Sequence, residues 1–324
     1  MLNNIFIWIL NQGIELGVIV LLLLPLRALL RKTAPRSFAY LLWGIIPINM
    51  VGSLLTKVYS KFLYWAVAVV DKSISLNLHG RVLLLCKWVL SVGIAVMVLY
   101  RIYSYLKLRK SLVGSIRLQE NIYMTDRISA PFSMGVLHPR IYLPYSLQKE
   151  YYEPVILHEK VHIARKDLWM NYTAMLLLVL FWFQPVLWIA YPLFVKDMEE
   201  ACDETVIRKR PMEFRACYAE ALVEVSYQVE KVGAVVTGYG SGEIEGRITH
   251  VMTYKEPRLW MKLCMALVSV LFVLIAIPAS RKTPHVFWLE SENKETLSET
   301  NLRVEESGVI EKSGIVVEVL PLEE

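Results

Sequence analysis

The chain has 324 residues, of which 55% are hydrophobic and 20% are charged, and its formal net charge is +5. A soluble protein of this length carries about 25% charged residues. The apolar residues gather in separate blocks, which excludes an ordinary soluble domain and indicates a membrane protein.

Four of the apolar blocks have the length and composition of membrane-spanning helices, which need about 20 predominantly apolar residues. We predict these helices at about 5–27, 38–55, 82–104 and 258–279. The first block lacks a basic start and ends in Leu26-Arg27-Ala28-Leu29-Leu30-Arg31-Lys32 without a small-residue cleavage site. We therefore expect it to be a retained anchor and not a cleavable signal peptide.

Basic residues near the ends of the predicted spans indicate their orientation. One cluster follows the first block and another follows the third: Arg27, Arg31, Lys32 and Arg36, then Arg101, Lys107, Arg109, Lys110 and Arg117. We expect both clusters in the cytoplasm, the N-terminus outside, residues 106–257 in the cytoplasm, and a short acidic tail, 280–324, outside.

The charge of the chain is divided between the tail and the remainder. The tail has 5 Lys/Arg against 10 Glu, a net of −5, so the remainder carries +10. This excess suits the cytoplasmic membrane surface, and membrane lipids are therefore expected partners. No aromatic-basic binding motif accompanies it, so we predict no direct contact with nucleic acid.

Short strands and helices are predicted between the third and fourth blocks. Residues 115–123 alternate weakly and favour a strand, and 130–144 favour two short strands around a turn. Pro154 suits the first turn of a helix. Residues 196–229 favour a second helical region, in which Pro211 marks a break or a new start.

Two of the six histidines of the chain lie four residues apart in the stretch "LHEKVHIARKD". Residues i and i+4 share a face of a helix, so His158 and His162 could hold one zinc ion. Glu159 could take a proton from a zinc-bound water. This is the H-E-x-x-H pattern of metalloproteases, with a chance occurrence of about 1% in this chain. The alternative is a surface helix with a Glu159–Lys160 charge cluster.

A catalytic zinc usually needs a third protein ligand. The four cysteines include no CxxC pair, so the donors must be histidines and carboxylates. The run "KDMEEACDETVI" contains Glu199, which lies 37 residues beyond His162, and Asp203, again at i and i+4. Glu199 as a ligand, with Asp203 orienting a ligating histidine, is chemically coherent.

Two other residues of this run remain alternatives to Glu199 as the third ligand. A further alternative involves no metal. Glu200 lies one position round the helix from Glu199. Cys202 is disfavoured, because its thiolate is expected to face away from Glu199. The acidic run could also be a solvated face.

A fifth apolar block, 175–195, decides whether these residues can meet. If it crossed the bilayer once, His158 and Glu199 would lie on opposite sides. Pro185 lacks an N–H and breaks a helix here, and irregular backbone at this depth must pack on protein or line a cavity. We predict a re-entrant hairpin that turns near Gln184-Pro185 with both ends cytoplasmic. The alternative is a straight span and no zinc site.

Five motifs, in this order, resemble the membrane metallopeptidases of the BlaR/MecR antirepressor type, which are gluzincins: "APFSMGVLHPRIYLP", "LHEKVHIARKDLWMN", "FWFQPVLW", "DMEEACDETVI" and "GYGSGEIEGRITHVM". The resemblance covers roughly residues 5–277. It implies His158, His162 and Glu199 as zinc ligands, Glu159 as the general base and Asp203 as the orienting partner. Members of this family transmit an external signal and cleave a cytoplasmic repressor, directly or through themselves.

The end of the chain departs from that family pattern. Its best-known sensors carry a large external penicillin-binding domain after the last span, whereas residues 280–324 are too few for one. No S-x-x-K followed by K-T-G occurs in this tail. We therefore expect no direct covalent sensing of a beta-lactam.

The predicted fold is a mainly α membrane protein with four transmembrane helices, an embedded α+β cytoplasmic zinc metallopeptidase domain and a re-entrant hydrophobic hairpin. The predicted function is a Zn²⁺-dependent endopeptidase of transmembrane signalling in a bacterial cell membrane. Its substrate would be a cytoplasmic, repressor-like regulator, which adds a strand to an edge at 131–136. The glycine-rich segment 232–246 is predicted to be a flexible loop and a candidate for self-cleavage. A homodimer is compatible with these features. The rival is a non-catalytic membrane signalling scaffold with a vestigial metal site.

Overall fold

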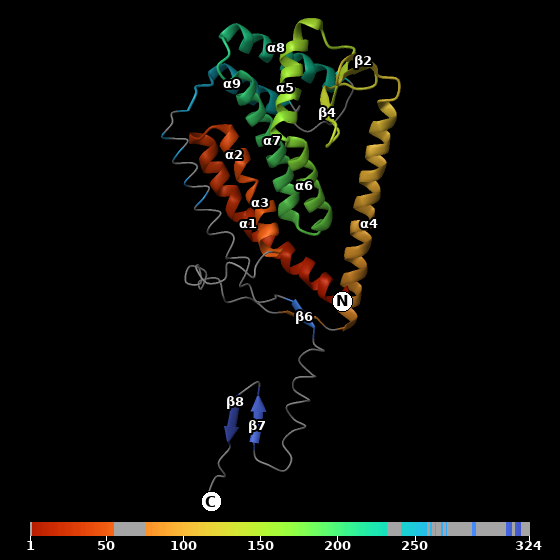
Figure 1. Cartoon of the computed structure of the whole chain (residues 1–324), viewed down its shortest axis with the longest axis vertical. Helices are drawn as coiled ribbons and strands as arrows, with labels where there is room; N and C mark the ends of the chain where they lie inside the picture. The colour runs from red at the N-terminus through yellow and green to blue at the C-terminus, as the bar shows by residue number, and fades with distance from the viewer. Residues whose placement is uncertain are drawn as a thin grey trace, which may run out of the picture.

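The computed structural model describes residues 2–54, 76–78, 80–231, 241–257, 287–289, 309–312 and 315–318, with single helical positions between 260 and 270. Long helices lead from the N-terminal end of the molecule to a smaller α+β unit at the other end (Figure 1). Helices α1 (Leu2–Thr33) and α4 (Gly80–Ser111) both run in this direction.

Within the described residues, two helices are long and apolar enough to cross a membrane. They are Gln12–Arg31, within α1, and Leu84–Ser111, within α4. They correspond to the first and third predicted spans. The predicted fourth span, 258–279, falls largely outside the described residues.

The prediction of one continuous helix over 38–55 is wrong. The chain instead forms α2 (Arg36–Leu42) and α3 (Ile45–Leu54), with a turn at Trp43 and Gly44 between them. Pro47 gives the physical reason, because a proline ring clashes with the carbonyl four residues earlier, here that of Trp43. Glycine next to this position lowers helix propensity further.

The fifth apolar block folds into a helical hairpin with a turn at 181–184. Helix α6 (Asp167–Leu180) ends before a turn, and α7 (Pro185–Ile207) starts with Pro185 at its first position, where a missing N–H costs nothing. The start of α6 and the end of α7 both lie toward the α+β unit (Figure 1). At the tip of the hairpin, Gln184 donates to the carbonyl of Gly13 in α1 at 2.9 Å.

A four-stranded sheet has the order β2-β3-β5-β4. Its strands are β2 (Ile116–Gln119), β3 (Ile122–Thr125), β4 (Phe132–Met134) and β5 (Arg140–Pro144). Strands β3 and β5 are parallel, and the other pairs are antiparallel. The predicted strands are confirmed, although the stretch 115–123 holds β2 and the start of β3 instead of a single strand. Strand β4 lies at an edge of the sheet.

Helices cover this sheet and complete the α+β unit. After a short 3₁₀ turn (η2, Lys149–Tyr151), they are α5 (Tyr152–Arg165), α8 (Met212–Lys231) and α9 (Ser241–Thr253). The new helix start predicted after Pro211 is confirmed. The loop predicted over 232–246 is wrong from Ser241 onward, because Ile244, Ile248 and Val251 give α9 an apolar face, and Ile248 and Val251 pack on α7 and α8.

Helix α7 belongs to two hydrophobic cores. Its first half packs with α1, α2, α3 and α6, through residues that include Leu187 and Phe194. Its second half packs with α8 and α9, through Cys202, Val206 and Ile207. A third core joins the sheet to α5 and α8. Helix α7 therefore connects the long helices to the α+β unit.

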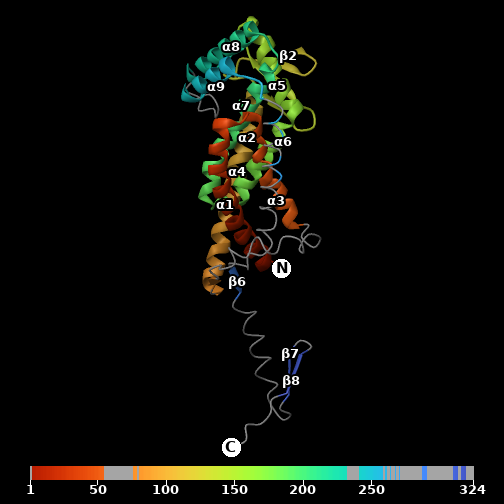
Figure 2. The ribbon, with the colours of Figure 1, turned by 90° about the vertical axis from the view of Figure 1, so that its left-hand side faces the viewer.

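Short strands lie toward the end of the molecule that is opposite the α+β unit (Figures 1 and 2). Strand β1 (Leu76–Leu78) pairs in parallel with β6 (Phe287–Leu289). Strands β7 (Val309–Lys312) and β8 (Ile315–Glu318) form an antiparallel pair. The described residues before and after 258–286 lie at opposite ends of the molecule.

Candidate metal centre

Helix α5 presents both predicted histidines on its buried face. His158, Glu159 and His162 are each at most 6% exposed. The helix ends at Lys166, which adopts a left-handed conformation with φ of 61°, and α6 starts at the next residue. This sharp reversal turns Asp167 back toward His162.

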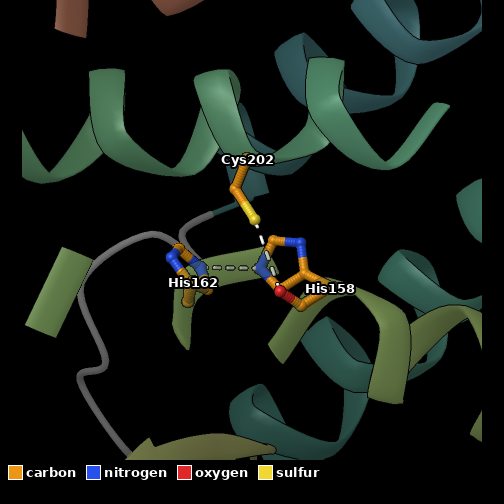
Figure 3. A group of neighbouring side chains, drawn as sticks. All are labelled: His158, His162 and Cys202. Carbon is orange, nitrogen blue, oxygen red and sulfur yellow. Dashed lines mark hydrogen bonds between the residues drawn. The ribbon is translucent and has the colours of Figure 1, made fainter. Parts of the chain in front are cut away.

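The two imidazoles face each other through their Nε2 atoms, which are 3.0 Å apart (Figure 3). Each Nδ1 has a partner on its other side. His162 Nδ1 lies 2.7 Å from Asp167 Oδ2, and His158 Nδ1 lies 2.7 Å from the Tyr218 hydroxyl. That hydroxyl donates to Asp203 Oδ1 at 2.5 Å. Each Nδ1 therefore carries the proton as a donor, and both Nε2 lone pairs point into the same space.

Arg247 fixes the charge of Asp203 at the back of this chain of hydrogen bonds. Its guanidinium donates to Asp203 Oδ2 at 2.7 Å and to Oδ1 at 2.8 Å. Burial acts to raise the pKa of Asp203, but the adjacent Arg247 holds it below the ordinary value. Asp203 thus accepts hydrogen bonds as a carboxylate and orients His158 through Tyr218.

Glu199 brings a third donor to the two lone pairs. Its Oε2 lies 3.4 Å from His158 Nε2 and its Oε1 lies 3.5 Å from His162 Nε2. Arg247 Nη2 lies 3.4 Å from the same Oε2 of Glu199. Ligand atoms about 2.0–2.1 Å from a tetrahedral zinc lie about 3.3 Å from one another. The spacing of the three side chains therefore fits one zinc ion.

Cys202 also reaches this centre, which corrects the expectation that it faces away. One ligand atom of each of His158, His162 and Cys202 lies within 4.8 Å of the others. Cys202 follows Glu199 by three residues, and residues i and i+3 are neighbours on a helix. Its thiol is fully buried and donates to the carbonyl of His158 at 3.4 Å (Figure 3).

A cavity of about 270 Å³ lies over the centre. His158, Glu159, His162 and Glu199 form part of its wall. Pro131, which precedes β4, and Phe132 and Ser133 of β4 form another part of the wall. Residues of α6 and α7 form the remainder. The cavity therefore connects the predicted edge strand to the two histidines and Glu199.

The comparison with known families agrees with this geometry. The model of the family "BlaR1 peptidase M56" matches residues 71–251, more than half of the chain. The chain belongs to this family. The match includes both histidines, Glu199, Tyr218 and Arg247, and it confirms the resemblance drawn from the motifs.

Two kinds of curated relative also match this M56 chain. The "Regulatory protein BlaR1" of Bacillus licheniformis is 27% identical over 246 residues, which are 68% of this chain and 40% of that protein. The "Methicillin resistance mecR1 protein" of Staphylococcus aureus (strain Mu50 / ATCC 700699) is 26% identical over 142 residues, which are 41% of this chain and 24% of that protein. The matches thus span less than half of the length of these relatives.

The acidic run of this M56 chain is not a solvated face. Asp197, Glu200, Asp203 and Glu204 are each at most 4% exposed. Glu200 forms ion pairs with Arg31 and Arg36 and not with the histidines. Glu199 therefore lies beside the two histidines, whereas its predicted rival Glu200 lies against α1 and α2.

Three further residues contact the site but were not assigned by the sequence. Asp167 and Tyr218 bond the histidines, and Arg247 bonds Asp203. Tyr40 of α2 in turn donates to Asp167 Oδ1 at 2.8 Å. Asp167 stands in the quoted motif "LHEKVHIARKDLWMN", whereas Tyr218 lies in no local pattern that would have singled it out.

Proposed function

We propose that this chain is an integral-membrane, zinc-dependent endopeptidase that cleaves a cytoplasmic regulator in transmembrane signalling. The observation that carries the proposal is the pair of imidazole Nε2 atoms 3.0 Å apart, with both Nδ1 atoms engaged elsewhere. Both Nε2 atoms and the Glu199 carboxylate face the same space, where a cation would be attracted by all three groups. Nitrogen and oxygen donors in this number suit Zn²⁺.

The proposed reaction is hydrolysis of a peptide bond. When bound by His158, His162 and Glu199, zinc would supply a Lewis acid that activates water and polarises the scissile carbonyl. Glu159 accepts the proton of the attacking water and donates it to the leaving amine, so that the carboxylate is regenerated. Asp167 and the Tyr218–Asp203 pair hold the two imidazoles in orientation.

The proposed substrate segment is extended and lies along β4. Phe132 and Ser133 of this strand line the cavity that contains the histidines. In the described sheet, β4 pairs only with β5, so its other edge can accept a further strand by backbone hydrogen bonds. A flexible segment of a repressor-like protein meets this requirement. Self-cleavage within the predicted segment 232–246, of which 232–240 lie outside the described residues, is the second proposed reaction, and mass spectrometry of the activated protein tests it.

The proposed topology has four spans, with the peptidase unit in the cytoplasm. The basic C-terminal ends of α1 and α4 lie toward the α+β unit (Figure 1), as the excess of Lys and Arg on cytoplasmic sides requires. The α2–α3 pair leads back toward the other end. Strands β1 and β6 pair there, which supports a common outer side for the segment after α3 and for the tail.

The zinc content of the detergent-purified protein tests the proposal. We expect about one zinc per chain in the wild type, and loss of zinc in His162→Ala and in Glu199→Ala. The matched variant is Glu200→Ala, which removes the neighbouring carboxylate and should retain zinc. Absence of zinc from wild-type protein purified without chelator would reject the proposal and favour the scaffold.

A further inference from the structure

Helix α7 carries five acidic residues within eight positions, and they divide between two faces. Glu199, Cys202 and Asp203, at i, i+3 and i+4, form the front face toward the metal centre. Asp197, Glu200 and Glu204, at i, i+3 and i+7, form the rear face. The acids of the rear face are buried, so their partners decide how α7 is held.

The rear face is bound to α1 and α2. Arg27 donates to Asp197 through two nitrogens, at 2.5 Å and 2.7 Å. The indole N–H of Trp43 donates to the same carboxylate at 2.8 Å. Arg31 and Arg36 form ion pairs with Glu200. The basic residues that orient the first span are therefore also the partners of α7.

Glu204 extends this attachment to the start of α2. Its carboxylate accepts the backbone N–H groups of Arg36 at 2.6 Å and of Ser37 at 2.9 Å. These are groups at a helix N-terminus, which lack partners within their own helix. An acid of α7 thus caps α2, and α1, α2 and the rear face of α7 form one connected unit.

A second attachment lies at the other end of α7. Phe183 and Gln184, which directly precede α7, fit against Gly13 and Gly17 of α1, where a Cβ on either glycine would collide with them. The two attachments are separated by about 20 Å along α7, at 1.5 Å per residue. Helix α1 therefore holds α7 at two points and limits both its sliding and its tilt.

We propose that Arg27 and Asp197 are positioning residues of the metal centre, through which α1 sets the place of Glu199 relative to His158 and His162. This inference rests on the proposed function. The histidines belong to α5, whereas Glu199 lies two residues from Asp197 on α7. Metal-ligand geometry must be held within about 0.5 Å, so a small displacement of α1 changes the coordination of the metal. A signal that moves the first span would reach the centre by this route.

Cobalt substitution tests the inference without a known substrate. The probe is Co²⁺ alone, added to the metal-free full-length protein in detergent, and the readouts are its visible absorption bands and its affinity in competition with a chelator. Asp197→Asn keeps the size of the side chain but removes its charge. We expect shifted bands and about 10–100-fold weaker binding, the range found when groups that orient ligands are changed.

Controls separate positioning from general stability. Glu224→Gln on α8 makes the same chemical change at a partly buried acid that bonds Gln228 and not α1, and it should leave the bands unchanged. Arg27→Lys keeps the positive charge but lacks the two-nitrogen fork. It gives a second measurement if Asp197→Asn fails to fold, and we expect shifted bands there too.

The outcomes are distinct. Unchanged bands and affinity in both Asp197→Asn and Arg27→Lys would overturn the inference. A lower melting temperature with unchanged bands would also overturn it, because the pair would then serve stability alone. Failure of the wild type to bind Co²⁺ would refute the proposed zinc site itself, and a positioning role for a metal ligand along with it.

Discussion

The two faces of α7 carry similar acidic residues but are neutralised in different ways. On the rear face, Asp197 and Glu200 meet arginines of the chain itself, and Glu204 meets backbone N–H groups. On the front face, Arg247 pairs with Asp203 and also lies 3.4 Å from Glu199, which faces the Nε2 atoms of both histidines. The partners of the rear face all belong to the chain, whereas the proposed function adds a bound cation to the front face. An acid of α7 is therefore a candidate metal ligand where it shares its space with two imidazole Nε2 atoms.

The largest effect is expected for Glu159, which lies beside the front face and is not one of the proposed metal ligands. Glu159→Gln should reduce peptide cleavage by about 10²–10⁴-fold, because the amide cannot accept the proton of the attacking water. Its zinc content should stay at the wild-type level. The measurement is cleavage of a repressor-like substrate, or of a quenched peptide library, alongside metal analysis.

The same variant distinguishes the peptidase from the non-catalytic scaffold. If cells that carry Glu159→Gln respond to the signal as wild-type cells do, while the variant holds zinc, the metal serves structure alone. His162→Ala is the companion variant, since it should lose both zinc and the response.

A smaller effect is expected for the hydroxyl that links the front face to His158. Tyr218→Phe removes the acceptor of the Nδ1–H and the donor to Asp203. We expect about 10–100-fold weaker zinc binding, as for other partners of ligating histidines. Tyr254→Phe is the matched control, because that ring packs on His250 and not on a site histidine. Equal affinities in the two variants would contradict the role assigned to Tyr218.

Asp203, the front-face acid that pairs with Arg247, should make the stability of the protein depend on pH. The pKa of Asp203 is held below its ordinary value of 3.8 in the folded protein, because Arg247 outweighs the effect of burial. A lowered folded pKa stabilises the protein above the unfolded pKa, and the contribution is lost as pH falls through the folded value. Thermal unfolding between pH 7 and pH 3 should therefore be less pH-dependent in Asp203→Asn than in the exposed control Asp126→Asn. Parallel curves would show that Asp203 carries no such contribution.

Local spacing predicted the parts of the site that lie on single helices. The pair His158 and His162 follows from an i, i+4 spacing, and the hairpin turn follows from Pro185. Cys202 was misplaced because the i, i+3 neighbour of Glu199 was assigned to the wrong face. Residues Tyr218 and Arg247 come from α8 and α9, so only the tertiary packing of these helices brings them to the site.

Backbone features account for the other differences. Asp167 reaches His162 because Lys166 adopts a left-handed conformation, which a lysine does not signal in a sequence. Apolar content predicted one span over 38–55, but it does not register the backbone clash that Pro47 creates four residues earlier. Glycine content indicated a loop near residue 241, although an apolar period of α9 runs through the same segment.

The smallest effect is expected for Cys202, the remaining donor of the front face. Its thiol donates to the carbonyl of His158 and lies on the fully buried side of the centre, whereas Glu199 borders the cavity. If His158, His162 and Glu199 hold the metal, the cavity would leave room for the water that a catalytic zinc requires. We therefore expect Cys202→Ala to weaken zinc binding by less than about threefold, and Co²⁺-loaded wild-type protein to lack a sulfur-to-cobalt charge-transfer band. Such a band, lost in Cys202→Ala together with tenfold or greater loss of affinity, would make Cys202 a fourth ligand. The front face would then hold a closed, four-coordinate metal, and activation would require the thiolate to leave it.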